Sequence, residues 1–201
     1  MVDSVSSVSG AGFPSEGSGG GDVSLESELQ GLSNTLQSPP GGSLSKDQLS
    51  GIFYFLRMID NESPSCSSFD QAFTQFQQDY NTIMKSPGNT LSSDQLSQVS
   101  KDIANMAQTN PTMSEATLNR VMVAGLNAVS QELNSPNANV VDQAKGELIA
   151  VSSFLSGGPW GDTVASIGTQ MTFDLNNNAP ISAYENDIQE ILSTPPFNGI
   201  T

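Results

Sequence analysis

Residues near the C-terminus have the spacing of a calcium-binding loop. Carboxylate and amide oxygens are the ligands that Ca²⁺ takes, and the EF-hand arranges them over twelve residues. Ala179 departs from that pattern, because the sixth position favours Gly for a sharp turn. The simpler expectation is a polar loop that caps the last helix, so we assign no metal site and leave calcium binding open. The matching residues, at positions 1, 3, 5, 8, 9 and 12, are Asp174, Asn176, Asn178, Ile181, Ser182 and Glu185.

Two other groups of residues have types that occur in catalytic sites. Glu185, Asp187 and Glu190 lie close together in sequence, but glycoside chemistry needs two carboxyl groups held across a cleft. A solvated acidic helix face explains them better. Cys66 lies in a Ser-rich stretch among acids, which disfavour the thiolate that a nucleophile needs.

The chain contains no histidine. A His-based catalytic triad, an imidazole acid–base catalyst and a His metal site are therefore excluded. The glycines at 17–21 belong to a Ser/Gly-rich stretch and do not follow a strand, so they do not predict a phosphate-binding loop. We predict a protein that is not an enzyme and has no catalytic, cofactor-binding or metal residues.

The charge of the chain restricts its partners. It has 21 acids against 6 bases, a net charge of −15, and its first 45 and last 56 residues carry acids alone. Such a field repels nucleic acid and anionic membranes. No apolar run approaches the length of about 18 residues that a spanning helix needs, so stable membrane insertion is not expected. Solubility explains most of the acidity, and a basic protein partner is the other interpretation.

The chain divides into three parts. Residues 1–21 hold six Ser and six Gly, a composition that predicts a disordered tail. Residues 22–42 predict a short amphipathic helix, about 23–37, and a Pro/Gly linker. This helix has three possible states: docked on its own domain, paired with a partner helix, or only marginally stable. Its apolar face consists of Leu25, Leu29, Leu32 and Leu36.

Residues 43–201 form the predicted helical domain. Apolar residues recur at helical spacing in five segments, and short links rich in Pro, Asn, Ser or Gly separate them. Links of that length favour antiparallel neighbours, so the predicted fold class is all-α, an antiparallel multi-helix bundle. We leave 162–174 unassigned, expect a last short helix at about 182–193, and interpret Trp160 as a plug over the bundle end. The five predicted helices span about 46–60, 68–85, 93–108, 115–134 and 140–156.

A seven-residue motif marks two of these helix starts. Leu44–Ser50 returns nearly unchanged as Leu91–Ser97. Each copy has a Ser that accepts from the first turn and a Gln three residues later that reaches back, which is a capping box. A weaker version begins at Met113.

The overall character of the chain suggests a route out of the cell. It has a base-free Ser/Gly-rich N-terminus, an acidic helical body rich in Gln, Asn and Ser, and a single cysteine. Its first residues lack the positive and apolar regions of a general secretory signal. In composition it resembles type III secretion substrates such as harpins, translocators and needle-tip or filament proteins. That resemblance implies a non-enzymatic virulence protein, secreted without a signal peptide, which works through protein–protein contacts and possesses a secretion chaperone.

Two further interpretations come from different classes of protein. Long apolar helix faces and flexible ends are also typical of a structural subunit of a virion or filament, which self-assembles through helix–helix contacts. A protein retained in the cytoplasm, with acidic ends that recruit a basic partner, is the third. The sequence identifies neither the partner nor the oligomeric state.

Replacing Ser45 or Ser92 with Ala should lower the free energy of unfolding by about 0.5–2 kcal/mol, because the first turn loses its side-chain acceptor. Urea unfolding followed by circular dichroism measures this loss. If neither substitution changes stability, the repeated motif marks something other than a helix start.

Overall fold

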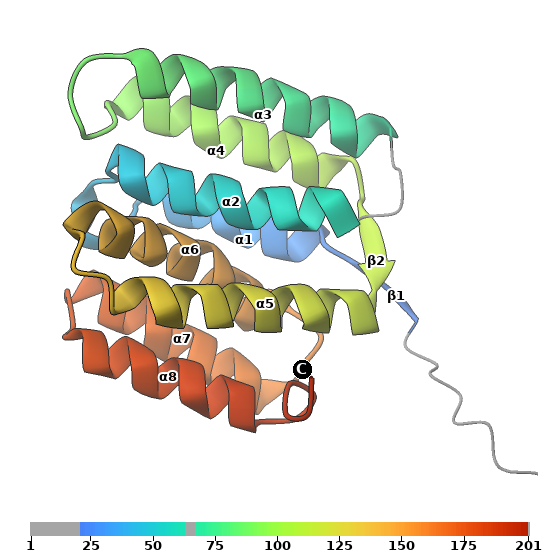
Figure 1. Ribbon diagram of the computed structural model, residues 1–201. Coiled ribbons are helices and arrows are strands. Elements are labelled where there is room, and N and C mark those ends of the chain that lie inside the picture. Colours follow the sequence, from blue (N-terminus) through green and yellow to red (C-terminus); the bar gives the residue numbers. More distant parts are fainter. Residues whose placement is uncertain (1–20, 63–66, 201) are drawn as a thin grey trace, which may run out of the picture.

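The structure is a computed structural model that describes residues 21–62 and 67–200 (Figure 1). This part of the chain is mostly helical, so the predicted all-α bundle is confirmed. The predicted tail, apart from Gly21, lies outside the described residues. The helices are α1 Glu26–Gln37, α2 Lys46–Glu62, α3 Ser67–Lys85, α4 Ser93–Gln108, α5 Glu115–Leu133, α6 Ala138–Gly157, α7 Asp162–Asn176 and α8 Ile181–Ser193. Two three-residue strands, β1 Asp22–Ser24 and β2 Thr112–Ser114, and a 3₁₀ turn at Pro40–Gly42 complete it.

The helices form two layers (Figure 1). One layer runs α3, α2, α5, α8 and the other runs α4, α1, α6, α7, with each helix in contact with its neighbours in the layer. Consecutive helices run in opposite directions, as their short links predict. The contacts between the layers are those of α3 with α4, α2 with α6, α5 with α6, and α7 with α8.

The segment at 162–174, which the sequence left unassigned, is helix α7. Gly168 interrupts its apolar pattern and lowers its helix propensity. The structure gives a reason for this glycine, since a Cβ at this position would lie 2.8 Å from the Cβ of Leu155 in α6. Gly168 therefore allows α7 to pack closely on α6.

Helix α1 is part of the main core. Of the three states considered for it, the structure shows the one in which it docks on its own domain. Its three leucines, Leu29, Leu32 and Leu36, and its N-cap residue Leu25 are fully buried, and the helix packs on α4 and α6. A polar contact fixes it further, because the Ser33 hydroxyl donates to the Ser100 carbonyl at 2.8 Å and the Ser100 hydroxyl donates to the Ser33 carbonyl at 2.9 Å.

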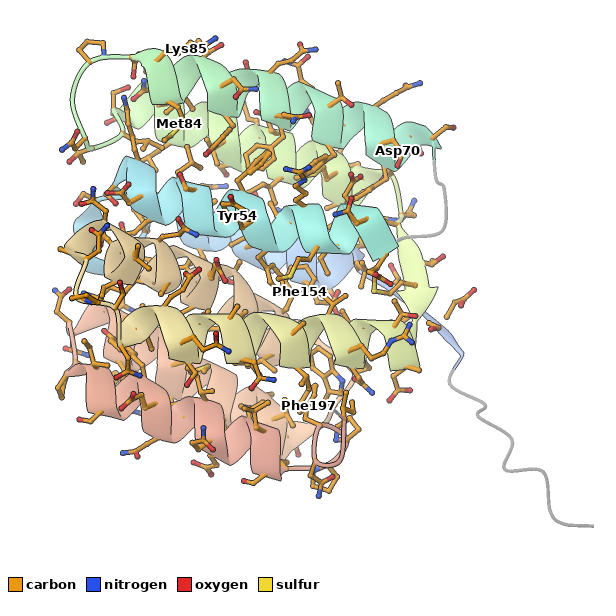
Figure 2. The ribbon with its side chains drawn as sticks, in the orientation of Figure 1. Tyr54, Asp70, Met84, Lys85, Phe154 and Phe197 are labelled. Atoms are coloured by element: carbon orange, nitrogen blue, oxygen red, sulfur yellow. The ribbon has the colours of Figure 1, made fainter. Side chains whose placement is uncertain are left out.

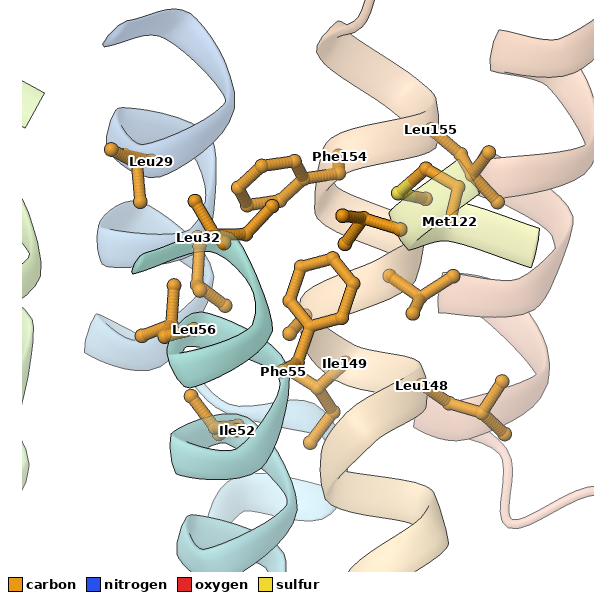
Figure 3. Packing of buried hydrophobic residues seen from close by; sticks show 14 of the residues in the cluster. Leu29, Leu32, Ile52, Phe55, Leu56, Met122, Leu148, Ile149, Phe154 and Leu155 are labelled. Carbon is orange, nitrogen blue, oxygen red and sulfur yellow. The ribbon is translucent and has the colours of Figure 1, made fainter. Parts of the chain in front are cut away.

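Helices α2 and α6 approach each other more closely than side chains normally permit. A Cβ at Gly51 would lie 2.0 Å from the carbonyl oxygen of Gln143, and one at Gly146 would lie 1.9 Å from that of Gln48. Each helix thus presents a glycine to the backbone of the other. Beside this contact Phe55 meets Phe154 edge to face at 5.1 Å, among the buried aliphatic residues that Figure 3 shows.

The aromatic stripe of α3 belongs to the core. Phe76 is fully buried and Phe73 nearly so. Phe53 of α2 stacks on Phe73 at 5.7 Å and on Tyr80 at 4.2 Å between ring centroids. This seam joins α3 to the rest of the bundle.

The predicted capping boxes are present. The Ser45 hydroxyl accepts from the Gln48 N–H at 3.0 Å and the Gln48 side chain accepts from the Ser45 N–H at 2.9 Å; Ser92 and Gln95 repeat the arrangement. Ser114 caps α5 by accepting from the Thr117 N–H. Ser45 also donates to Asp142 of α6.

Short backbone pairings tie the helix starts together at both ends of the bundle. β1 pairs antiparallel with β2 ahead of α1 and α5. At the other end the two copies of the repeated motif lie side by side, where the Leu91 N–H donates to the Leu44 carbonyl at 2.9 Å. The sequence predicted neither pairing, because a two- or three-residue strand is too short to show an alternating pattern.

We expect Gly146→Ala to lower the free energy of unfolding by roughly 1–3 kcal/mol, because its methyl group would force α2 and α6 apart. Gly31→Ala in α1 is the matched control, since its Cβ would lie 4.0 Å from the nearest atom, the Ser153 carbonyl oxygen. That change should raise stability by up to about 1 kcal/mol through helix propensity. Equal effects in urea unfolding would contradict the close α2–α6 contact.

Candidate functional site

The calcium-loop residues do not form a twelve-residue loop. Asp174 and Asn176 lie within α7 and Ile181 begins α8, so only 177–180 separate the two helices. The Glu185 carboxylate accepts from the Asn134 side chain at 2.7 Å. Throughout residues 21–62 and 67–200, no three His, Cys, Asp or Glu side chains gather in a way that could hold a metal ion.

The remaining candidates are Cys66 and three acids of α8. Cys66 lies outside the described residues. Glu190 is exposed and Glu185 is half-buried, but Asp187 is buried between α8 and its neighbours. The expectation of a solvated acidic face is therefore wrong for Asp187. The reason is visible in the sequence, because Asp187 follows Tyr184 by three residues and precedes Ile191 by four, which places it on the apolar stripe of α8.

The chemically distinctive feature of the fold is a set of acids that face each other across helix pairs. The first pair joins α3 and α4. Asp102 is only 2% exposed, and Gln98 donates to its Oδ1 at 2.9 Å. The same amide lies 3.2 Å from Oδ2 of Asp79, which also accepts from Gln75 at 3.0 Å. Burial, reinforced by the charge of Asp79, raises the pKa of Asp102 to about 6.

The second pair joins α5 and α6. Glu147 is 3% exposed and sits at the α2–α6 contact, where its backbone N lies against Gly51. Burial raises the pKa of Glu147 to about 7, with a further contribution from the charge of Glu132. Burial also raises the pKa of Glu132, whose Oε2 has no hydrogen-bond partner.

The third pair joins α7 and α8. Burial raises the pKa of Asp187 to about 6, and the charge and hydrogen bonding of Asp174 act in the same direction. Asp174 Oδ1 accepts from Gln170 at 3.1 Å. The Tyr184 hydroxyl closes the site by donating to the Asp174 backbone carbonyl at 3.2 Å.

A fourth pair, Asp60 and Asp70, lies between the end of α2 and the start of α3, where Figure 2 shows Asp70. Burial is the main reason that the pKa of Asp60 rises, and the Asp70 charge adds to it. Arg57 opposes the shift. The charges that raise the pKa of Asp102, Glu147 and Asp187 come from other acids.

Sequence reasoning missed these acids, although a signal for two more of them was present. Asp102 lies three residues after Val99 and four before Met106, and Glu147 lies three after Ala144 and four before Val151. These are positions on the buried stripe of a helix. An acid on an apolar stripe is therefore the pattern that identifies a buried acid in the sequence. The acid that it meets on the next helix can be identified only from the fold.

Trp160 occupies the position expected of a plug. It is half-buried, its ring centroid lies 5.2 Å from that of Phe197, and its indole N–H donates to Asn119 of α5 at 2.6 Å. These contacts tie the turn between α6 and α7 and the C-terminal segment to α5.

Two of the surface grooves are poor in acids. A hollow of about 670 Å³ between the end of α1 and α4 is lined mainly by small and polar residues, including Gln37, Ser97 and Lys101. A second, of about 400 Å³ between α2 and α5, is lined by Met58, Val121 and other residues of both helices. Neither lining contains two acids.

Comparisons with known proteins returned no match among family models, curated proteins or solved structures. In the described part of the chain, none of the helices has the length and apolar character required to cross a membrane.

Asn119→Ala should lower the free energy of unfolding by about 1 kcal/mol, because the half-buried indole N–H loses its acceptor. The emission of Trp160, the single tryptophan of the chain, should also shift. Asn127→Ala, at an exposed position of the same helix, is the control and should change neither quantity. If Asn119→Ala matches it in both, Trp160 is not held by this bond.

Proposed function

We propose that this chain is a non-enzymatic protein that leaves the cell through a specialised, type III-like secretion system. It acts as an accessory or translocator-type component of that system or as an effector. The proposal rests on the change in the character of the chain at residue 21. A base-free Ser/Gly-rich stretch of 21 residues precedes a body whose helices begin at Glu26 and continue to Ser193.

The topology supports passage through a narrow conduit. Each helix runs antiparallel to the next, and short links join them. The pairs α2–α3, α3–α4, α5–α6, α6–α7 and α7–α8 also pack on each other, and contacts between helices that are near in sequence form fast. With one cysteine, the chain carries no internal disulfide that would have to be reduced before threading.

The surface supports action through protein contacts. Only 13% of the residues are charged, about half the usual share, and the exposed side of α3 is rich in uncharged Gln and Thr. Tyr54 is an exposed aromatic residue on α2, where Figure 2 shows it. Phe173 and Ile181 are exposed near the α7–α8 turn.

The virion or filament subunit has less support. The apolar helix faces that motivated it are used inside the bundle, including the leucines of α1 and its N-cap residue Leu25. If the protein is nevertheless such a subunit, light scattering on the purified chain at high concentration will show growing particles.

The test is a secretion assay in the native host, with cells and medium blotted for the full chain and for a variant lacking residues 2–20. This deletion keeps Gly21, whose carbonyl accepts from the Glu115 N–H at 3.4 Å, so it removes no residue of the described fold. We expect the full chain in the medium and the shortened chain in the cells.

Two controls sharpen the result. A version with residues 2–20 scrambled tests whether composition or order is read, and a cytoplasmic marker in the medium reports lysis. Retention of the full chain inside the cells, with the secretion system active, contradicts the proposal.

A further inference from the structure

Four carboxylate oxygens are buried without a hydrogen-bond partner in residues 21–62 and 67–200, and all follow one pattern. They belong to Asp60, Asp102, Glu132 and Asp187. Each of these side chains interacts with an acid on a helix adjacent in sequence. The partners are Asp70, Asp79, Glu147 and Asp174, respectively.

Such a pair is unstable when both groups are ionised. Two negative charges close together repel each other, and burial by itself disfavours the charge on Asp102, Glu147 and Asp187. One shared proton removes both problems, because the orphan oxygen becomes an O–H donor or accepts from a protonated partner. The carboxyl groups of Asp102 with Asp79, and of Asp187 with Asp174, are within hydrogen-bonding reach of each other.

The charged groups around these pairs do not neutralise them, so a bound proton is the compensating charge. Around Asp102, α3 contributes Asp79, while Glu28 of α1 lies against Gly157 of α6 instead. Lys101, the neighbour of Asp102 on α4, is exposed and is not among the groups that act on it.

The surroundings of the other two pairs are similar. Glu147 receives the charge of Glu132 from α5, and the groups that act on it include none from α1, α2 or α7. Asp187 receives the charges of Asp174 from α7 and of Glu190 from α8 itself. Arg120, the base on α5, bonds to Thr117 of its own helix.

We propose that three pairs of acids are proton-binding sites: Asp79–Asp102 between α3 and α4, Glu132–Glu147 between α5 and α6, and Asp174–Asp187 between α7 and α8. A proton bound at each site stabilises the contact between its two helices, so the bundle is most stable in acid and becomes less stable towards neutral pH. Asp60–Asp70 is left out because Arg57 partly neutralises it. These sites are a property of the folded chain and do not depend on its export.

The direction of the pH dependence follows from linkage. The pKa values of Asp102, Glu147 and Asp187 are raised to about 6, 7 and 6, so the folded chain binds these protons more tightly than the unfolded chain does. The resulting stability is fully present below the ordinary carboxyl range near pH 4. It is lost as the pH rises through 6 and 7. This is the reverse of a protein held by salt-bridged carboxylates.

The experiment is thermal unfolding of the full chain between pH 4.5 and 8.5 at constant ionic strength, with and without the triple substitution Asp102→Asn, Glu147→Gln and Asp187→Asn. We expect the wild-type midpoint to fall by on the order of 5 °C or more from pH 5 to pH 8. The triple variant should lose most of that slope and be the more stable protein at pH 8, because each amide keeps the shape of a protonated carboxyl group.

Glu62→Gln, an exposed acid at the end of α2, is the matched control and should keep the wild-type slope. A carbon-13 NMR titration of the wild-type carboxyl groups tests the same sites if the triple variant fails to fold. Midpoints of Asp102 and Asp187 well above the ordinary range support the proposal. Ordinary midpoints, a flat wild-type profile, or an unchanged slope in the triple variant would each overturn it.

Discussion

The contact between α2 and α6 at Gly51 and Gly146 is the constraint on which the rest of the described fold depends. Helix α6 also packs against α1, α5 and α7, so its distance from α2 sets the spacing of both layers. With a side chain at either glycine the two backbones could not touch. Phe55 would then not meet Phe154 at the same depth, and the layers would separate at their centre.

The same contact has an electrostatic consequence. Gly146 is followed by Glu147, so the close approach that the glycine permits also carries a carboxyl group into the core. The charges that act on Asp102, Glu147 and Asp187 come from other acids and add to the effect of burial. A chain with 21 acids and 6 bases has few cations to spare. Where two acids meet across a helix pair, a bound proton therefore takes the place of a Lys or Arg as the counterion. The proposed pH dependence and the acidic composition thus share one cause.

The export proposal and the fold are compatible in physical terms. Helices that are consecutive in sequence, such as α5 with α6 and α6 with α7, can come apart and re-form through local contacts. Helices α1 and α2 depend on distant partners instead, because the buried leucines of α1 pack on α4 and α6, and α2 packs on α6. The first helix after the Ser/Gly-rich stretch therefore needs partners that lie much later in the sequence, and a secretion chaperone that binds it would keep the whole core from closing.

Local signals made most of the helices predictable. The capping Ser and Gln residues, the Pro- and Gly-rich links and the apolar stripes placed α2 to α6 and α8 within a few residues of their observed ends. The stripes also identified Phe73 and Phe76 as core residues. Helix α7 was missed because Gly168 weakens its pattern, and that glycine is explained only by the neighbouring α6.

By itself, the sequence determined the fold class, the helix starts, the absence of histidine chemistry and the sign of the electrostatic field, because these depend on composition and on residues a few positions apart. Tertiary structure alone decided that α1 belongs to the core, that two glycines bring α2 and α6 into contact, and that buried acids meet in pairs. Those outcomes join residues such as Asp79 and Asp102, or Gly51 and Gly146, that lie on different helices. A helical stripe shows which face is buried but not which helix covers it.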